Sequence, residues 1–117
     1  MIWFRVDADE HLAPWVLQVG NEAYGCYLRL AGYCARHLTD GHVPRQVARV
    51  ILGGLDPDAL DALVDAGRVE IDDDGTVRLP HYLDLNQSRE QVEAKKAANA
   101  ERVAKHRRKK RGNLHAV

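Results

Sequence analysis

The sequence predicts an α+β fold followed by a basic arm, and two observations support this. Between Asp40 and Pro80, short apolar runs alternate with turn residues in the order strand, helix, turn, helix, hairpin. From Gln87 onward, the chain is rich in Ala, Gln, Glu, Lys and Arg, which are all good helix formers. The first pattern is the element order of a winged helix-turn-helix. We therefore expect a winged-helix domain over residues 1–86, with an extra N-terminal strand and helices, and a basic helical or flexible arm over residues 87–117.

The segment before Asp40 is expected to support this domain. Ile2–Val6 is rich in β-branched and aromatic residues, which favours a short strand. The apolar residues between His11 and Val19 indicate a short amphipathic helix. Asn21 is a suitable N-cap, and apolar side chains then recur every three or four positions up to Leu38. This spacing predicts a longer helix that packs against the winged-helix unit.

Proline and glycine mark the two short helices that follow. Pro44 suits the first position of one helix, which Gly53 ends. Asp56 is a good N-cap for a second helix, Pro57–Ala66. Gly67 occupies the place of a C-terminal cap. In a winged helix, the second helix of this pair is the one that reads DNA.

A β-hairpin is predicted next. Two strand-like runs, Arg68–Ile71 and Thr76–Leu79, flank the turn Asp72–Gly75. An Asp-Gly pair between such runs is a strong hairpin signal. His81–Leu85 is expected to pack back onto the domain through Tyr82 and its two leucines.

Charge is divided unevenly along the chain. Residues 1–86 carry seven Lys and Arg against fourteen Asp and Glu, a balance of −7, whereas residues 87–117 carry ten against three, a balance of +7. Such asymmetry indicates an interaction tail. The helix of the arm is expected to begin at a capping box formed by Ser88 and Gln91.

The chain resembles small winged helix-turn-helix DNA-binding proteins from phages of actinobacteria, which are similar to the N-terminal domain of DnaD-type phage replisome organisers. The runs that carry the resemblance are Trp3–Asp7, Asn21–Gly25, Leu38–Pro44, Leu63–Gly67, His81–Leu83 and Ser88–Gln91. The resemblance covers nearly the whole chain. It implies a winged helix, a replication or transcription-control setting in the cytoplasm of a bacterial host, and no enzyme activity.

The arm is the strongest candidate for nucleic-acid binding. Lys105–Arg111 places six fixed positive charges in seven residues, and such a run repels itself unless an anion is present. Nucleic-acid phosphate is the commonest such anion, so double-stranded DNA is the expected partner. A solubilising tail without a partner is the alternative. A membrane surface is not expected, because interfacial helices need a bulky apolar face. The candidate binding residues are Arg45, Arg49, Arg68, Arg78, Arg89, Lys95, Lys96, Arg102, Lys105, Arg107, Arg108, Lys109, Lys110 and Arg111.

The helix that would read DNA has the wrong charge for that role. Its expected outward residues are Asp58, Ala59, Asp61, Ala62 and Asp65, and three carboxylates would be repelled by phosphates. Two interpretations remain open. In the first, DNA is held by Arg45 and Arg49, by Arg68 and Arg78 at the wing, and by the arm. Alternatively, the acidic face docks a protein, such as a replication accessory or a host protein, and only the arm touches nucleic acid. The acidic face could also hold the basic arm of the same or another copy, and the oligomeric state stays open.

No motif indicates catalysis, a metal or a cofactor. Cys26, Cys34, His37 and His42 match no zinc spacing with closely paired cysteines. Cys26 and Cys34 are eight residues apart in one predicted helix, too far for a disulfide. Asp72–Gly75 lacks the later glutamate of a calcium loop. We therefore expect a non-enzymatic protein without a bound cofactor.

Overall fold

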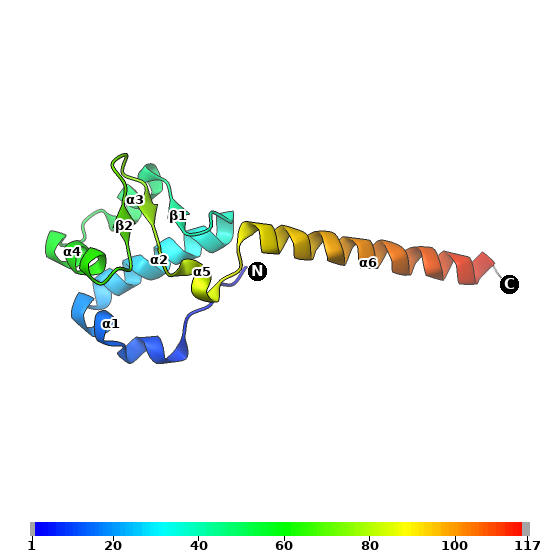
Figure 1. Cartoon of the computed structure of the whole chain (residues 1–117), viewed down its shortest axis with the longest axis horizontal. Coiled ribbons are helices and arrows are strands. Elements are labelled where there is room, and N and C mark those ends of the chain that lie inside the picture. The colour runs from blue at the N-terminus through cyan, green and yellow to red at the C-terminus, as the bar shows by residue number, and fades with distance from the viewer. Residues whose placement is uncertain (1, 116–117) are drawn as a thin grey trace. The chain divides into compact units, whose positions relative to one another are not determined.

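The computed structural model describes residues 2–115, with side chains through residue 112. The fold is α+β, about 66% helical, with one small antiparallel sheet (Figure 1). The chain divides into two compact units, Met1–Gln87 and Ser88–Val117. The elements of the first unit are the 3-10 helix η1 (Ala8–Leu12), α1 (Pro14–Val19), α2 (Asn21–His37), β1 (His42–Val43), α3 (Arg45–Leu52), α4 (Pro57–Asp65), β2 (Glu70–Ile71), β3 (Val77–Arg78) and α5 (Tyr82–Leu85). The second unit is one helix, α6 (Arg89–His115).

Helix α2 is the central element of the first unit, because it contacts α1, α3, α4 and β1 (Figure 1). Its side chains Ala23, Leu30 and Cys34 are completely buried. Together with the buried Tyr27, these positions are spaced by three or four residues, which places them on one side of the helix. The predicted long helix is therefore confirmed, although Gly20 rather than Asn21 is its N-cap.

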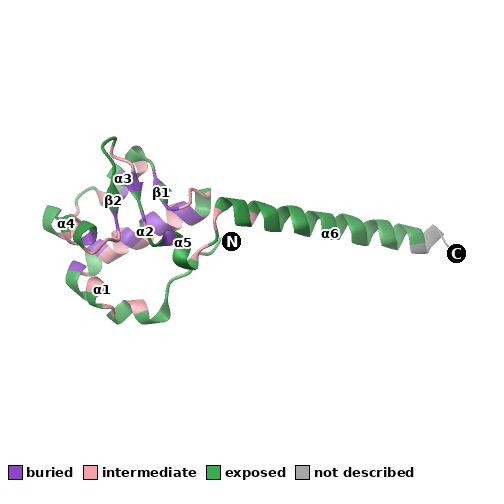
Figure 2. Cartoon of the chain, viewed as in Figure 1, coloured by how far each residue is buried: buried purple, intermediate pink, exposed green. Residues whose placement is uncertain are grey.

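The sheet has the strand order β1-β3-β2. Val77 of β3 lies opposite Val43 of β1 and opposite Ile71 of β2. Val43 and Val77 are buried, whereas Ile71 is 47% exposed. The sheet therefore contributes to the core mainly through β1 and β3 (Figure 2).

The first unit has its own hydrophobic core. The fully buried large side chains of the core are Leu30, Leu63, Val43, Val69 and Val77, and Figure 2 shows the buried residues concentrated in this unit. Among the residues whose side chains the structure describes, the buried hydrophobic ones all lie between Val16 and Tyr82. The first unit thus contains the packing that an independently folded domain needs.

Three predicted caps and turns are confirmed. The carboxylate of Asp56 accepts a hydrogen bond from the backbone N–H of Asp58 at 3.0 Å. Ser88 N donates to Gln91 Oε1 at 2.9 Å, and Gln91 N donates to Ser88 Oγ at 3.1 Å, which is a capping box. Gly67 has φ +72°, and Arg68 N donates to Leu63 O at 3.1 Å to close the end of α4.

The predicted strand at Ile2–Val6 is wrong. This segment forms no strand, and Trp3 is 79% exposed. The Asn86 side chain accepts a hydrogen bond from Arg5 N at 2.7 Å and donates to Arg5 O at 3.4 Å. A side-chain amide therefore satisfies the backbone groups that a neighbouring strand would otherwise bind.

Two further predictions of burial were wrong. Only Tyr82 of α5 is buried, while Leu83 and Leu85 are each 48% exposed. Ala59 and Ala62 of α4 face inward and pack against the core rather than facing outward.

The single helix expected between His11 and Val19 is instead divided into η1 and α1 around Ala13.

Candidate nucleic-acid interface

Helix α6 presents the basic residues of the arm to solvent. Every residue from 93 to 112 is exposed (Figure 2). Between Arg89 and Gly112, its two large apolar residues, Val92 and Val103, are eleven positions apart and make no continuous apolar face. The basic side chains placed here are Arg89, Lys95, Lys96, Arg102, Lys105, Arg107, Arg108, Lys109, Lys110 and Arg111.

Few of these cations are neutralised within the helix. Arg89 Nε lies 2.9 Å from Glu93 Oε1, and these two side chains form an ion pair. Arg102 donates a hydrogen bond to Asn99 Oδ1 at 2.7 Å, which leaves its charge unpaired. The run from Lys105 to Arg111 contains no acidic residue at all. Dense unpaired cations on an exposed helix bind polyanions by releasing condensed counterions.

Arg45 and Arg49 lie together beside the hairpin. Both project from α3 and border a groove of about 360 Å³. The groove is lined by Arg45, Ala48, Arg49, Leu52, Gly53, Ile71, Gly75 and Val77. A side chain added at Gly75, which has φ +87°, would meet Arg45 Cδ at 2.7 Å. The glycine at the hairpin turn therefore lets the Arg45 side chain pack against the turn.

Arg78 and Arg68 have other partners. Arg78 on β3 forms an ion pair with Glu70 on β2. The negative charge of Glu70 therefore offsets the positive charge of Arg78 at the wing. The guanidinium carbon of Arg68 lies 4.6 Å from the centre of the Trp15 ring. Arg68 was expected at the wing beside Arg78, but it follows the end of α4 and turns toward α1. The structure therefore places Arg45 and Arg49 beside the hairpin that carries Arg78, whereas Arg68 lies against Trp15.

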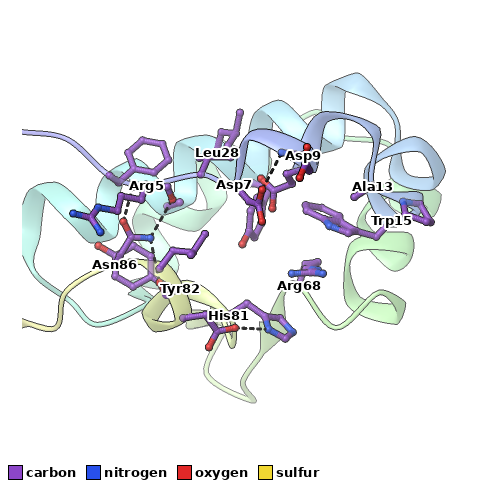
Figure 3. Close-up of a pocket in the computed structure, with 18 residues that line it drawn as sticks. Arg5, Asp7, Asp9, Ala13, Trp15, Leu28, Arg68, His81, Tyr82 and Asn86 are labelled. Atoms are coloured by element: carbon purple, nitrogen blue, oxygen red, sulfur yellow. Dashed lines mark hydrogen bonds and ion pairs between the residues drawn. The ribbon is translucent and has the colours of Figure 1, made fainter.

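Arg68 lines a second cleft of the first unit, of about 510 Å³ (Figure 3). Arg5, Asp7 and Asp9 approach it from the N-terminal segment. Sequence reasoning missed this cleft, because Arg5 and Asn86 meet across 81 positions of chain and no local pattern indicates such a contact.

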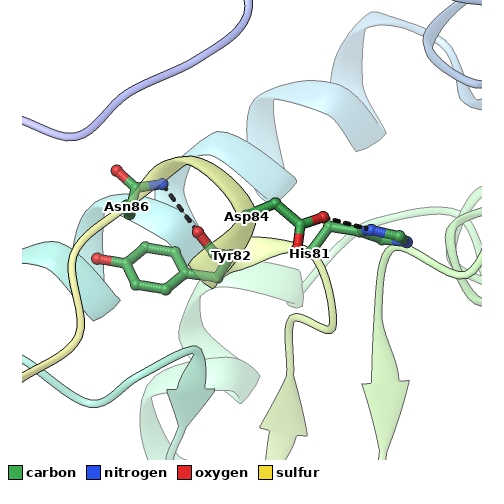
Figure 4. Close-up of polar contacts among 4 residues, drawn as sticks. All are labelled: His81, Tyr82, Asp84 and Asn86. Atoms are coloured by element: carbon green, nitrogen blue, oxygen red, sulfur yellow. Dashed lines mark hydrogen bonds and ion pairs between the residues drawn. The ribbon is translucent and has the colours of Figure 1, made fainter.

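The cleft's walls are held by side-chain hydrogen bonds. Beside the cleft, the Tyr24 hydroxyl donates to Glu10 Oε2 at 2.8 Å. Burial, together with this hydrogen bond, raises the pKa of Tyr24 to about 12. On α5, His81 Nδ1 lies 3.0 Å from Asp84 Oδ2, and Asn86 Nδ2 donates to Tyr82 O at 3.1 Å (Figure 4). These contacts fix the chain where the first unit ends.

Helix α4 presents an acidic surface. Asp58, Asp61 and Asp65 are all exposed, and none of them forms an ion pair among the residues described. Their spacing of three and four places them on one side of α4. This is the face that a DNA-reading helix would present to the groove. Its charge is negative, like that of the phosphates, so the two would repel each other.

The cysteines are structural. Both are free thiols, and Cys34 is buried where its Sγ donates to His42 O at 3.7 Å. Burial raises the pKa of both Cys26 and Cys34. Within the described part of the chain, no three metal-ligating side chains come together, and no helix there has the length and apolar content to cross a bilayer.

Comparison of the chain with protein-family models, with curated proteins and with solved structures gave no match.

Proposed function

We propose that the protein binds double-stranded DNA, without enzymatic activity, in phage replication or transcriptional control in a bacterial cytoplasm. Helix α6 supplies the electrostatic affinity. The observation that carries this proposal is the exposed run Lys105–Arg111, with six fixed positive charges in seven residues and no acidic neighbour inside it.

The arrangement of the first unit supports the winged helix-turn-helix part of the proposal. Helices α2, α3 and α4 precede the hairpin, and β1 pairs with β3 in the order β1-β3-β2. Arg45 and Arg49 border the groove beside the hairpin, where they add a small basic site. The acidic face of α4 argues against groove insertion by that helix.

The test compares the full chain with a version that ends at Gln87, over a salt series and with duplexes of several sequences. The shorter version retains every buried core residue, so loss of binding would not reflect loss of the core. If the full chain neutralises about five phosphates, log K should fall against log salt with a slope of about −4.5. Failure of the full chain to bind duplex DNA at low salt would disprove the proposal.

Protein docking through α4 is the second candidate. Asp58, Asp61 and Asp65 form an exposed acidic face without intramolecular ion pairs among the described residues. Such a face fits a basic surface on a replication or host protein. A shorter version that keeps sequence-specific DNA binding would contradict this second candidate, because it would show that the first unit reads DNA. Loss of all DNA binding on truncation, without sequence discrimination by the full chain, would favour it.

A further inference from the structure

The charged residues of α6 are distributed unevenly around the helix, with Arg89, Lys105 and Arg107 at the borders between two opposite sides. Residues three or four positions apart share a helix face. One side, which we call the groove face, carries Lys95, Lys96, Asn99, Arg102, Val103, His106, Lys109 and Lys110. The opposite side, the outer face, carries Glu90, Glu93, Ala97, Glu101, Ala104, Arg108 and Arg111. All three glutamates of the helix therefore lie on the outer face, and the groove face has no acidic residue.

The described contacts agree with this division. Arg102 donates to Asn99 Oδ1 at 2.7 Å, so these two side chains meet on the groove face. Arg89 Nε pairs with Glu93 Oε1 at 2.9 Å, away from that face. The side chains of both faces are exposed along the helix. The groove face thus carries five fixed positive charges and no carboxylate between Lys95 and Lys110.

We propose that the groove face of α6 lies in the major groove of B-form DNA while the outer face points away from the duplex. This inference rests on the proposed function. Lys95 to Lys110 spans about 22 Å of helix, and an α-helix about 10–12 Å across fits a major groove about 12 Å wide. Glutamates on the outer face avoid the phosphates on both sides of the groove.

The residue types of the groove face suit two kinds of contact. Lys95, Lys96, Lys109 and Lys110 neutralise phosphates, which sets position and affinity without reading sequence. Between them, Asn99 and Arg102 occupy the middle of the face. Asn suits the adenine edge and Arg suits the guanine edge in the major groove. The centre of α6 therefore contacts base edges, and its ends contact the backbone.

Four consecutive residues provide a matched test in the full chain. K109Q/K110Q removes two charges from the groove face, and R108Q/R111Q removes two from the outer face. Glutamine is a good helix former, so both variants keep the helix. We expect K109Q/K110Q to reduce the salt slope by about 1.8 and the affinity for duplex DNA at 0.15 M salt roughly 30-fold. R108Q/R111Q should weaken binding less than about 3-fold, because the outer face points away from the duplex and makes no phosphate contact.

A second pair of neighbours separates a groove contact from overall charge. Arg102→Gln lowers the charge by one on the groove face, and Glu101→Gln raises it by one on the outer face. If only overall charge mattered, the two changes would have equal and opposite effects. We expect Arg102→Gln to weaken binding at least about 5-fold, as loss of one contact to a guanine edge does, and Glu101→Gln to leave it within 2-fold. Far-ultraviolet circular dichroism of each variant verifies the helix content.

The form of the duplex gives the third comparison. The major groove of A-form RNA is deep and narrow, so an α-helix with its side chains does not enter it. The full chain should bind a DNA duplex at least 10-fold more tightly than an RNA duplex of the same sequence. Equal affinity for both, or equal losses in K109Q/K110Q and R108Q/R111Q, would overturn the groove face while leaving electrostatic DNA binding intact. Absence of DNA binding by the unmodified chain would overturn both.

Discussion

Two tyrosines of the first unit make its stability depend on alkaline pH. Burial and the hydrogen bond to Glu10 raise the pKa of Tyr24 to about 12, and burial raises the pKa of Tyr82 to about 12. In the unfolded chain, a tyrosine ionises near pH 10. The folded state therefore favours the neutral phenols. Their contribution to stability is complete below about pH 10 and is lost as the pH rises toward 12.

We expect the free energy of unfolding by urea to fall between pH 10 and pH 12. Tyr24→Phe, which has no ionisable hydroxyl, should show a shallower fall than the unmodified chain. The measurement is urea unfolding followed by circular dichroism at several pH values. A pH profile identical in the two proteins would show that Tyr24 does not carry the effect.

Single residues also show which contacts could be predicted from the local sequence. Asp56, Ser88 and Gln91 were identified from local chemistry, and each forms the expected hydrogen bond because a cap depends on neighbours two or three positions away. The cation–π contact between Arg68 and Trp15 was not predictable, because the two residues are 53 positions apart. Such contacts depend on the final packing of α1 against the end of α4.

The N-cap of α4 gives a prediction at the scale of one element. Asp56 is exposed, and its carboxylate accepts a hydrogen bond from the Asp58 N–H at 3.0 Å. Asp56→Ala should lower the free energy of unfolding by about 1 kcal/mol because this N–H loses its partner. Asp61→Ala is the matched control, since Asp61 is exposed in the interior of the same helix. It should change stability by less than about 0.5 kcal/mol.

These two alanine variants are compared by urea unfolding at pH 7. A loss in Asp61→Ala as large as that in Asp56→Ala would mean that charge on α4, rather than the cap, stabilises the helix. Both variants also remove one carboxylate, so their net charge is the same. The comparison therefore isolates the hydrogen bond.

Short elements were the least predictable from local sequence. Ile2–Val6 has strand-forming residues but no strand neighbour, and Asn86 satisfies the backbone of Arg5 instead. The strands β2 and β3 were located correctly because the Asp72–Gly75 turn brings them together, with Gly75 N donating to Asp72 O at 2.9 Å. A strand needs a partner, and only in the hairpin is that partner encoded nearby.

The whole molecule combines a core that was largely predictable with two parts of opposite net charge. The spacing in α2 indicated a buried side, and Tyr27, Ala31 and Cys34 are indeed buried. Ala59 and Ala62 of α4 pack against the core. This orientation was not predicted, because alanine fits either face of a helix. The exposed residues of α4 are then the three aspartates, together with Pro57 and Val64.

The division of charge between the two parts of the chain predicts self-association at low ionic strength. Residues 1–86 have a balance of −7 and residues 87–117 a balance of +7, so the 13.1 kDa chain has no net charge to keep copies apart. At about 0.01 M salt, charges act over about 30 Å, compared with about 8 Å at 0.15 M. The basic arm of one copy is then attracted to the acidic first unit of another.

We therefore expect the full chain to have an average mass above that of a monomer at about 0.01 M salt and to be monomeric at 0.5 M, where charges are screened to a few ångströms. Analytical ultracentrifugation across this range measures the change. A version ending at Gln87 retains only the acidic unit, so its copies repel one another and it should be monomeric throughout. Association of the shorter version, or a full chain that stays monomeric at low salt, would contradict the attraction. Under the proposed DNA binding, a duplex would compete for the same cations, so adding it at low salt should dissociate the full-chain assembly in proportion to the DNA bound.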